Sequence, residues 1–359
     1  MRNNGLLLIN PFGIGDVLFT TPLLHSIKDA YPDLRICYLC NSRSVSVLEG
    51  NPYIDKTIIY ERDDFEAARK KSFFLWLKKY KDFINRIKEE NFDIVLDLSL
   101  NTQYGFFCWC AGIPKRIGYD YKGRGRFLTQ KIPLSGYQEK HIIEYYNDLL
   151  QYLDLQTRYK NPELYVKEED KIKAGLILSQ NGIKEGDRLV AVIPGGGKSW
   201  GKDAYLKHWP QDRFAELADK IIENYQAKII IVGDFSEKEI VAGVISRMKQ
   251  KAIDLSGSTS IRELAAVIQR ADLVIANDGG PLHMAVALGR KTVSFFGPVD
   301  PKVYGPYPPD EKRHIVLGSK ASCGPCYNNF RLKDCVSNRE CLESIIVKDA
   351  LGAVERLMR

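Results

Sequence analysis

The first group with the chemistry of a catalyst is a carboxylate that follows a glycine-rich turn near the N-terminus. Residues 11–16 read Pro-Phe-Gly-Ile-Gly-Asp and come directly after the apolar run Leu6–Ile9. Gly13 and Gly15 permit a tight turn and let another molecule approach the backbone closely. Asp16 is predicted at or next to a helix N-cap, where it either caps the helix or serves as a general base. The turn lacks the third glycine of a dinucleotide fingerprint and any Gly-Lys-Ser/Thr ending, which argues against NAD and P-loop sites.

A second glycine turn indicates a phosphate site in the other half of the chain. The apolar run Leu189–Ile193 leads through a proline into three glycines and a lysine. These residues are Gly195, Gly196, Gly197 and Lys198. Backbone N–H groups and a lysine charge in such a turn suit a phosphate or pyrophosphate, and Lys207, shortly before the next helix, is a second cation of this kind. The alternative is a plain turn with solvated lysines.

A third turn combines a strand end, two glycines and a helix start. Residues 276–283 read Ala-Asn-Asp-Gly-Gly-Pro-Leu-His. Proline is favoured in the first turn of a helix, and the N–H groups there point outward toward an anion. The candidate anion-binding residues are Asp278, Gly279, Gly280 and His283. The proline-rich stretch 296–306 follows the next strand and is expected either to wall the same pocket or to form a structural turn.

Short apolar strands and helices alternate around all three turns. The strands are apolar on both faces, which predicts parallel sheets covered on two sides by helices. The pattern of strand, glycine turn and helix starts again after the connecting residues 155–166, and a length of 359 residues also favours two domains. We therefore expect an α/β fold with two Rossmann-like domains that face a cleft. Their predicted ranges are 1–160 and 161–359, with the last helix packing back on the N-terminal domain.

Composition and charge place the chain among ordinary globular proteins. Apolar residues make up 45% and charged residues 27%, and the net charge is +7. These values exclude collagen-like chains, disordered chains and disulfide-dense miniproteins. The apolar runs have the length of strands, well short of the ~20 residues of a membrane-spanning helix, and the N-terminus lacks a signal-peptide core. We expect a cytoplasmic protein.

Basic residues concentrate in two clusters of the first half. Residues 69–88 hold eight basic residues and one acid, and residues 115–131 hold six and one. Apolar residues recur at helical spacing in the first cluster, at Phe73, Trp76, Leu77, Tyr80, Phe83, Ile84 and Ile87. This stripe is either the core-facing side of a helix or, with the lysines between its members, a surface that docks on an anionic membrane. Both can hold along one helix whose ends differ.

The second cluster offers side chains that suit phosphate and carboxylate groups of an anionic partner. Its candidate residues are Arg116, Lys122, Arg124 and Arg126. Arginine forks pair well with phosphate and carboxylate groups. The alternative is a solvated basic loop. No nucleic-acid recognition module accompanies the cluster, so we expect no nucleic acid partner.

Four of the eight cysteines lie close together near the C-terminus. Cys323, Cys326, Cys335 and Cys341 have the spacing C-x2-C-x8-C-x5-C. Four thiolates with such spacing suit a tetrahedral zinc or iron ion in a structural role. The alternative is a set of free thiols that form disulfides only on oxidation. The other four cysteines are expected to be buried as small hydrophobic residues.

In their order and spacing, these segments resemble glycosyltransferase family 9, the ADP-heptose:lipopolysaccharide heptosyltransferases and their relatives. The most specific segments are Gly13 to Asp16, Asn277 to His283 and the stretch 296–306. The resemblance runs over nearly the whole chain and implies the GT-B architecture, with the nucleotide-sugar donor on the C-terminal domain and the acceptor on the N-terminal domain. It also implies inversion of the anomeric centre without a metal cofactor in catalysis.

The resemblance assigns a role to each candidate residue by position. Asp16 matches the catalytic base, and Lys207 matches a lysine that binds donor phosphate, with Lys198 as the alternative. The donor-binding set is Gly195, Gly196, Gly197, Lys198, Lys207, Asp278, Gly279, Gly280 and His283, and the acceptor-binding set is Gly15, Arg116, Lys122, Arg124 and Arg126. Asp234 and Glu237 follow a strand where relatives place an acid near the donor. Many relatives carry Ser or Thr where this sequence has Gly279. Related cysteine sets occur in parts of this family, and an iron-binding set marks its protein-heptosylating branch.

The resemblance and the residue chemistry lead to one functional expectation. The protein is expected to be an inverting glycosyltransferase that moves a heptose-type sugar from a nucleotide-diphosphate donor, ADP-heptose, to a lipopolysaccharide inner-core acceptor or another glycan. We expect peripheral contact with an anionic membrane surface on the inner face of the cell membrane. The alternatives are a nucleotide-sugar epimerase or hydrolase of the same architecture, in which Asp16 acts on the donor itself, and a non-catalytic lipid- or metal-binding relative.

Overall fold

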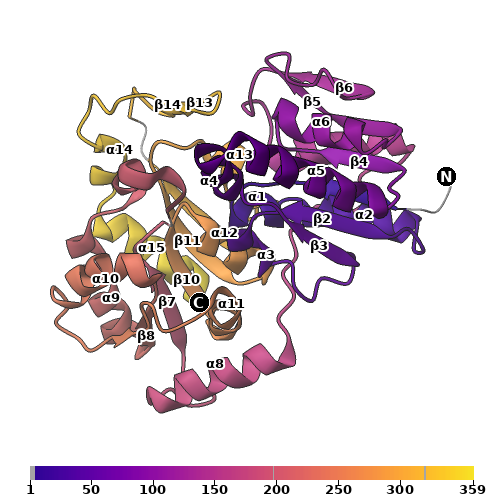
Figure 1. The fold of residues 1–359 in the computed structure, drawn as a ribbon. Coiled ribbons are helices and arrows are strands. Elements are labelled where there is room, and N and C mark those ends of the chain that lie inside the picture. The colour runs from indigo at the N-terminus through magenta and orange to yellow at the C-terminus, as the bar shows by residue number, and fades with distance from the viewer. Residues whose placement is uncertain (1–4, 197, 319–320) are drawn as a thin grey trace. The chain divides into compact units, whose positions relative to one another are not determined.

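The computed structural model describes residues 5–196, 198–318 and 321–359, which form two compact units (Figure 1). The first unit comprises Met1–Tyr137 and Ile142–Lys160, and the second comprises Gln138–His141 and Asn161–Arg359. The segment Gln138–His141 thus belongs to the second unit although it precedes the boundary expected at residue 160. Each unit contains a six-stranded sheet in which every recorded strand pair is parallel. The predicted α/β fold class is confirmed.

The sheet of the first unit has the strand order β3-β2-β1-β4-β5-β6. Its strands are β1 (Leu6–Ile9), β2 (Ile36–Cys40), β3 (Lys56–Ile59), β4 (Ile94–Asp97), β5 (Lys115–Tyr121) and β6 (Gln130–Leu134). All residues of β1, β2 and β4 are buried, as expected for strands that are covered on both faces. Ile9 lies beside Asp97 in the register, so the carboxyl ends of β1 and β4 are neighbours.

The helices of the first unit are α1 (Ile14–Leu18), α2 (Thr21–Ala30), α3 (Ser42–Val45), α4 (Arg62–Lys71), α5 (Phe73–Glu89), α6 (Thr102–Cys110), α7 (Ile142–Asp148) and the 3-10 helix η1 (Leu149–Leu153). The sequence predicts one helix from about residue 16 to residue 30, and the structure divides it into α1 and α2. Thr20 Oγ1 donates to Val17 O (2.7 Å), Thr21 Oγ1 donates to Leu18 O (2.7 Å), and Pro22 has no N–H. The Thr20 N–H still donates to Val17 O (3.1 Å), but the Thr21 hydroxyl occupies Leu18 O and Pro22 supplies no amide donor, so the helical ladder is interrupted here.

The long helix α5 has two different ends. Near its C-terminus, Phe83 and Ile87 are buried in the same core as Phe65 and Phe107. Near its N-terminus, Phe73 and Phe74 are exposed. The core-facing alternative therefore holds for the C-terminal part of α5, whereas its N-terminal part is exposed and membrane docking there stays a prediction. In the part of the chain that the structure describes, no helix is long and apolar enough to cross a membrane.

The sheet of the second unit has the order β12-β11-β10-β7-β8-β9. Its strands are β7 (Leu189–Ile193), β8 (Lys228–Ile231), β9 (Ile253–Asp254), β10 (Leu273–Asn277), β11 (Lys291–Phe296) and β12 (His314–Gly318). A two-stranded antiparallel hairpin, β13 (Tyr327–Asn328) and β14 (Arg331–Leu332), is separate from this sheet. The first strands of the two units, β1 and β7, occupy equivalent central positions. Each is flanked by the strand that follows it and by a strand reached through a crossover, β4 or β10.

Helices cover both faces of the second sheet (Figure 1). They are α8 (Glu168–Gln180), η2 (Lys198–Lys207), α9 (Gln211–Tyr225), η3 (Phe235–Glu237), α10 (Lys238–Ile245), α11 (Ile261–Arg270), α12 (Gly280–Ala287), α13 (Pro301–Tyr304), α14 (Glu340–Glu343) and α15 (Val347–Met358). The apolar sides of α9, α10 and α15 join one core with the strands, and α15 packs on α9, β11 and β12. The apolar face of this last helix is therefore buried within the second unit, and its return to the first unit stays a prediction.

Candidate active site

Asn277, the last residue of β10, links its own strand to the turn after β7 and to the segment before α9, at the carboxyl edge of the second sheet. β10 and β7 are neighbours, so the turns that follow them meet. The Asn277 Nδ2 donates to Pro194 O (2.7 Å) and Gly195 O (3.3 Å), and its Oδ1 accepts from the Trp209 N–H (2.9 Å). Asn277 is buried, so losing the Trp209 N–H would leave its Oδ1 unpaired, and losing both carbonyls would leave its Nδ2 unpaired. The sequence motif includes Asn277, but its positioning role becomes visible only in the structure.

Asp278 lies directly after this strand and forms a buried ionic pair with Lys207. The Lys207 Nζ lies 2.6 Å from Asp278 Oδ2, and the His283 Nε2 lies 3.8 Å from Asp278 Oδ1. Burial raises the pKa of the Asp278 carboxyl, but the Lys207 ammonium and His283 together bring that pKa below its usual value. The Lys207 ammonium also lies 4.7 Å from the centre of the Trp200 ring. The structure thus brings together Lys207, Asp278 and His283, three of the residues predicted to bind the donor.

Gly279 and Gly196 hold the two glycine turns in direct contact. A Cβ atom at Gly279 would lie 2.6 Å from Gly196 O, and a Cβ atom at Gly196 would lie 3.3 Å from Asp278 O. The first of these distances is impossible without a backbone shift. The Ser or Thr expected at position 279 in relatives therefore does not fit this arrangement of the turns. Gly280 begins α12 and Pro281 lies in its first turn, which confirms the predicted helix start.

The Glu237 carboxylate joins the first glycine turn to the turn after β8. Its Oε1 accepts from the Gly196 N–H (3.1 Å) and its Oε2 accepts from the Asp234 N–H (2.9 Å). A Cβ atom at Gly195 would collide with this carboxylate at 2.1 Å, so residue 195 must be a glycine here. The Gly196 N–H is thus directed at a buried protein carboxylate instead of a ligand. The expected donor-binding roles of Gly195 and Gly196 stay predictions.

Two predicted donor-binding positions cannot be placed in the same detail. Gly197 lies outside the described residues. Lys198 begins η2, but its side chain also lies outside the described part of the structure. Lys207, at the other end of η2, is therefore the one of the two candidate lysines with a described position in the site.

Two further histidines lie near this region, and both are held in the neutral form. His141 Nε2 lies 3.0 Å from Gly305 O, and its ring stacks on Tyr307 with centroids 4.4 Å apart. Burial, opposed by the bond to Gly305, lowers the pKa of His141 to about 3. Burial also lowers the pKa of His208 to about 4. The sequence carried no signal for His141, because it is a lone histidine outside every glycine motif.

Asp16 lies at the third position of α1 in the first unit, and Gly13 is the N-cap. The Asp16 Oδ2 accepts from the Gly13 N–H (3.3 Å), and the Asn10 Nδ2 donates to Asp16 O (3.0 Å). Asn41 Nδ2 secures the turn further by donating to Phe12 O (2.8 Å). Asp16 therefore does contribute to the helix start, but from the third helical position and not as the N-cap. This contact is compatible with a second role as a base because Asp16 is only half-buried.

The loop between β5 and β6 displays the basic residues that were predicted to bind the acceptor. Lys122 and Arg124 are exposed and lie over the Tyr121 ring, at 4.8 Å and 5.5 Å from its centre. Arg126 is exposed and lies 5.1 Å from the centre of the Phe127 ring. Arg116 differs, because its guanidinium donates to Phe127 O (2.6 Å) and to Ile113 O. Arg116 thus holds the loop in place, and its contact with an acceptor stays a prediction.

Asp97 is a buried carboxylate that the sequence reasoning missed. It is the last residue of β4, it is 4% exposed, and its Oδ1 accepts from the Ser99 N–H (2.9 Å). Burial raises the pKa of Asp97 to about 6, although hydrogen bonds from Ser99 act in the opposite direction. An aspartate that ends a buried parallel strand is a signal the sequence does contain, since that edge of a sheet is where ligands bind.

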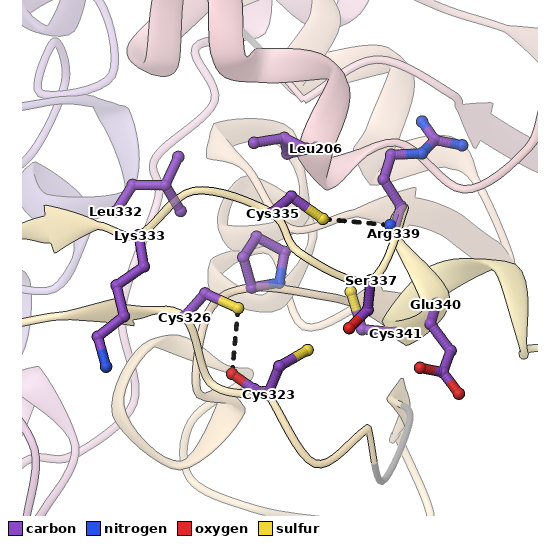
Figure 2. A pocket seen from close by; sticks show the side chains of 11 residues that line it. Leu206, Cys323, Cys326, Leu332, Lys333, Cys335, Ser337, Arg339, Glu340 and Cys341 are labelled. Atoms are coloured by element: carbon purple, nitrogen blue, oxygen red, sulfur yellow. Dashed lines mark hydrogen bonds between the residues drawn. The ribbon is translucent and has the colours of Figure 1, made fainter.

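The four cysteines near the C-terminus border one small pocket (Figure 2). Cys326 Sγ donates to Cys323 O (3.2 Å), and Cys335 Sγ accepts from the Arg339 N–H (3.2 Å). Burial and then the neighbouring thiols raise the pKa of Cys341. Among the residues that the structure describes, no three His, Cys, Asp or Glu side chains are arranged to hold a metal ion. The thiols are gathered in one place, but their present arrangement does not fit a metal site.

Comparisons with known proteins agree with this architecture. The profile of glycosyltransferase family 9 (heptosyltransferase) matches residues 81–336. The chain is 25% identical over 351 residues to lipopolysaccharide heptosyltransferase 3 of Escherichia coli (strain K12), covering 96% of this chain and 95% of that protein. The family 9 glycosyltransferase of Veillonella parvula DSM 2008 has a TM-score of 0.81 at 25% identity, with 98% and 96% of the two chains covered. The structure of Escherichia coli ADP-heptose lps heptosyltransferase II has the same fold, with a TM-score of 0.77 at 19% identity and coverage of 99% and 98%. The chain belongs to glycosyltransferase family 9, the heptosyltransferase family.

Proposed function

We propose that this glycosyltransferase moves a heptose-type sugar from a nucleotide-diphosphate donor, ADP-heptose, to a lipopolysaccharide inner-core acceptor, with inversion at the anomeric carbon. Membership of the heptosyltransferase family supports the sugar class, and the E. coli relative is named a lipopolysaccharide heptosyltransferase. The observation that carries the proposal is the buried Lys207–Asp278 pair beside two interlocked glycine turns. A preorganised cation at the carboxyl edge of a parallel sheet suits the diphosphate of a nucleotide-sugar.

On the donor side, Lys207 would stabilise the charge that gathers on the departing diphosphate. Asp278 and the Trp200 ring hold the ammonium in place before the substrate arrives, so little reorganisation is needed during the reaction. Asn277 and Glu237 serve this arrangement indirectly, because they fix the positions of the two turns. His283 completes the group from the first turns of α12.

On the acceptor side, Asp16 would take the proton from the attacking hydroxyl group. An inverting transfer needs a base that acts as the nucleophile attacks the anomeric carbon and the diphosphate leaves from the opposite side. The half-buried carboxylate at the start of α1 has this chemistry. The exposed Lys122, Arg124 and Arg126 would hold the acceptor through its phosphates or acidic sugars.

The decisive experiment compares donor turnover with and without acceptor. The protein is incubated with ADP-, GDP- and UDP-sugars, and nucleoside diphosphate and sugar products are measured. Release that requires the acceptor, is fastest with ADP-heptose and gives the inverted anomer supports the proposal. Turnover of the donor alone would instead identify an epimerase or hydrolase. Acceptor binding without any turnover would identify a non-catalytic relative.

We also propose that the exposed end of α5 rests on an anionic membrane surface that presents the acceptor. Phe73 is 61% and Phe74 81% exposed, and Lys78 and Lys81 are exposed on the following turns. The end of α4 adds the exposed cations Arg69, Lys70 and Lys71. Exposed aromatic rings among cations are typical of helices that lie at a membrane interface. Lys79 is less suited to this role, because its ammonium pairs with Asp64 at 3.1 Å.

Vesicle binding tests this surface. Each basic residue near an anionic surface contributes about 1 kcal/mol, so Lys78→Gln/Lys81→Gln should weaken binding to phosphatidylglycerol vesicles, with a smaller difference at high salt. The matched control is Arg86→Gln/Lys88→Gln, which removes two exposed cations from the other end of the same helix. Equal loss in both pairs would point to net charge alone. Turnover on a delipidated acceptor should be unchanged in both.

The four-cysteine pocket is our proposed location for a structural zinc or iron ion. Its support is the spacing of the thiols and their gathering at one pocket, and the thiols would have to rearrange before they could bind a metal ion. Metal binding would require Cys326 and Cys335 to give up their present hydrogen bonds. Metal analysis of protein purified without chelators tests this directly. One equivalent of metal that is lost in Cys323→Ser/Cys326→Ser supports it, and metal-free, fully folded protein would reject it.

A further inference from the structure

A second cavity lies at the edge of the second sheet opposite the candidate donor site. It has a volume of about 420 Å³ and is lined by Arg188, Asp272, Arg290, Lys291, Arg313 and Leu357, among others. Four of these residues come immediately before a strand: Arg188 before β7, Asp272 before β10, Arg290 before β11 and Arg313 before β12. These four strands are neighbours and parallel, so their amino ends bring the four side chains to one place.

The cavity carries an excess of positive charge. Four of its side chains are cations and one, Asp272, is an anion. Asp272 Oδ2 already accepts from the Leu189 N–H (2.8 Å), which fixes it against the strand edge. Within the described residues, none of the four cations forms a salt bridge with a carboxylate. Like charges that converge in a cavity repel one another, and a bound anion would relieve this repulsion.

Three of the four cations are held in place by backbone carbonyls, with most of their donors left over, while the Arg188 guanidinium lies 5.9 Å from the centre of the Tyr225 ring. Arg313 Nη2 donates to Gly289 O, and Arg290 Nε donates to Leu288 O (3.3 Å). Each guanidinium has five N–H donors, and in the described part of the chain each of these two uses one. Lys291 Nζ donates to Leu357 O (2.6 Å), a carbonyl in the last turn of α15. Gly289 has a positive φ of 68°, a conformation that favours glycine and leaves room beside Arg313.

The cavity can receive an anion of one or more phosphate groups. Adjacent strands are about 4.8 Å apart, so the backbone positions before β7 and before β12 are separated by about 14 Å. The long side chains at these positions can converge on one phosphate group or contact several linked or neighbouring phosphates. The cavity volume also lies within the range of small-molecule sites. Strands of five residues place this edge about 17 Å from the carboxyl edge where Lys207 lies.

We propose that this cavity is a second anion site, separate from the donor site, for a small molecule or headgroup that carries one or more phosphate groups. Arg188, Arg290 and Arg313 bind the phosphates through their unused N–H donors. Lys291, at the start of β11, adds a positive charge next to the end of α15. The proposal does not depend on the sugar that the enzyme transfers.

Titration calorimetry with inorganic diphosphate tests the site. Arg188→Gln/Arg290→Gln should lose one class of diphosphate sites, or weaken it at least tenfold, because charge-assisted contacts are removed. The matched control Lys171→Gln/Lys173→Gln removes two exposed cations from α8 in the same unit and should bind like the wild type. Unchanged number and affinity of sites in Arg188→Gln/Arg290→Gln would overturn the proposal.

A single variant and a vesicle-binding measurement complete the experiment. If Arg188→Gln/Arg290→Gln melts at a lower temperature than the wild type, the single variant Arg188→Gln replaces it, because the Arg188 side chain makes no hydrogen bond among the described residues. A threefold or greater loss of affinity is then expected. Phosphatidylglycerol vesicles distinguish the sources of phosphate. Because α5 is also expected to bind vesicles, the informative quantity is the difference between the wild type and the double variant. Weaker vesicle binding in the double variant identifies a lipid headgroup, whereas loss of diphosphate binding with unchanged vesicle binding identifies a soluble molecule.

Discussion

Each unit has a buried aspartate at the carboxyl edge of its sheet, on the strand that is paired with its first strand. Asp97 ends β4 beside β1, and Asp278 follows β10 beside β7. Burial raises the pKa of both carboxyls. For Asp97 the result is a pKa of about 6, whereas for Asp278 the Lys207 ammonium and His283 bring the pKa below its usual value.

The difference between the two pKa values shows that the sheet topology determines where a carboxylate lies, whereas the neighbouring side chains determine whether it is charged. The described residues around Asp97 supply hydrogen bonds from Ser99 and no cation. Asp278 is ionised and locked into a network with Lys207. The second unit therefore presents a fixed charge pattern, which suits the diphosphate site proposed above, while the first unit contains a carboxyl that can exchange a proton near neutral pH.

The largest expected effect comes from removing Lys207, the cation that lowers the pKa of Asp278 and has no counterpart beside Asp97 among the described residues. Lys207→Ala leaves Asp278 buried and unpaired, and should lower the free energy of unfolding by about 3–5 kcal/mol. In the wild type the lowered pKa of Asp278 stabilises the fold above pH 4, and this stabilisation is lost as the pH falls. In Lys207→Ala burial dominates, so stability should instead fall as the pH rises.

Denaturant unfolding at pH 5 and pH 8 measures this reversal, with the exposed Lys202→Ala as the control. The same variant should bind nucleoside diphosphate more weakly. A Lys207→Ala protein with wild-type stability and affinity would show that the ionic pair is not what distinguishes the two sites.

Asp97→Asn tests the other side of the comparison. The folded protein holds a proton on Asp97 up to a pKa of about 6, whereas the unfolded chain releases it near 3.8. Wild-type stability should therefore fall as the pH rises from about 4 to 6, by about 3 kcal/mol at one pKa unit per 1.36 kcal/mol. Asparagine keeps the acceptor for the Ser99 N–H and removes the charge. Asp97→Asn should be more stable than the wild type at pH 8 and no more stable at pH 4.

Asp120→Asn is a useful contrast within the same unit. Its carboxylate accepts from Lys131 (2.7 Å), and this hydrogen bond, followed by one from the Gly125 N–H, lowers the pKa of Asp120. Its replacement should therefore destabilise the protein at neutral pH. The idea that burial dominates at Asp97 fails if both variants shift stability in the same direction at pH 8.

Asp16→Asn tests which carboxylate of the first unit, Asp16 or Asp97, acts as the catalytic base. Asparagine can still accept from the Gly13 N–H, so the helix start should survive, but it cannot take a proton. The turnover number should fall by ~10²-fold or more. Thermal melting checks that the fold is intact. Normal turnover in Asp16→Asn would show that Asp16 has only a structural role. A larger loss of turnover in Asp97→Asn would instead identify Asp97 as the base.

Gly279→Ser should have a smaller effect than Lys207→Ala, Asp97→Asn and Asp16→Asn. The new Cβ would lie 2.6 Å from Gly196 O, so one of the two glycine turns must move. Overpacking of this kind costs about 1–3 kcal/mol. The expected result is a lower melting temperature and weaker donor binding, while Asp16 and the first unit are unaffected. A stable Gly279→Ser protein with tighter donor binding would show that the turns are free to separate.

The sequence is a good guide to the strands and turns and a poor guide to the contacts between them. Apolar runs followed by glycine predict β1, β7 and β10 with their turns, because burial on both faces and backbone freedom leave direct marks in the sequence. The break between α1 and α2 was missed, although the Thr-Thr-Pro sequence before Leu23 contains the signal.

The charge states of the site residues could not be predicted in this way. Asp278 and Lys207 are 71 positions apart, and only the fold shows that they pair. The contact of Glu237 could not be predicted either. Its carboxylate accepts from the Gly196 N–H, a group that the glycine motif predicted to bind a phosphate. His141 had no local signal at all, since its partners Gly305 and Tyr307 come from a distant loop.

The placement of Gln138–His141 has a consequence for how the chain can be divided. The backbone passes from the first unit to the second at residue 138, returns at residue 142 and passes again at residue 161. Because His141 is bound to Gly305 and stacked on Tyr307, a cut at residue 160 would leave part of the second unit on the N-terminal fragment. The two halves are thus not independent modules. A C-terminal fragment that begins at residue 161 would lack His141, and an exchange of halves between relatives must carry residues 138–141 with the C-terminal partner.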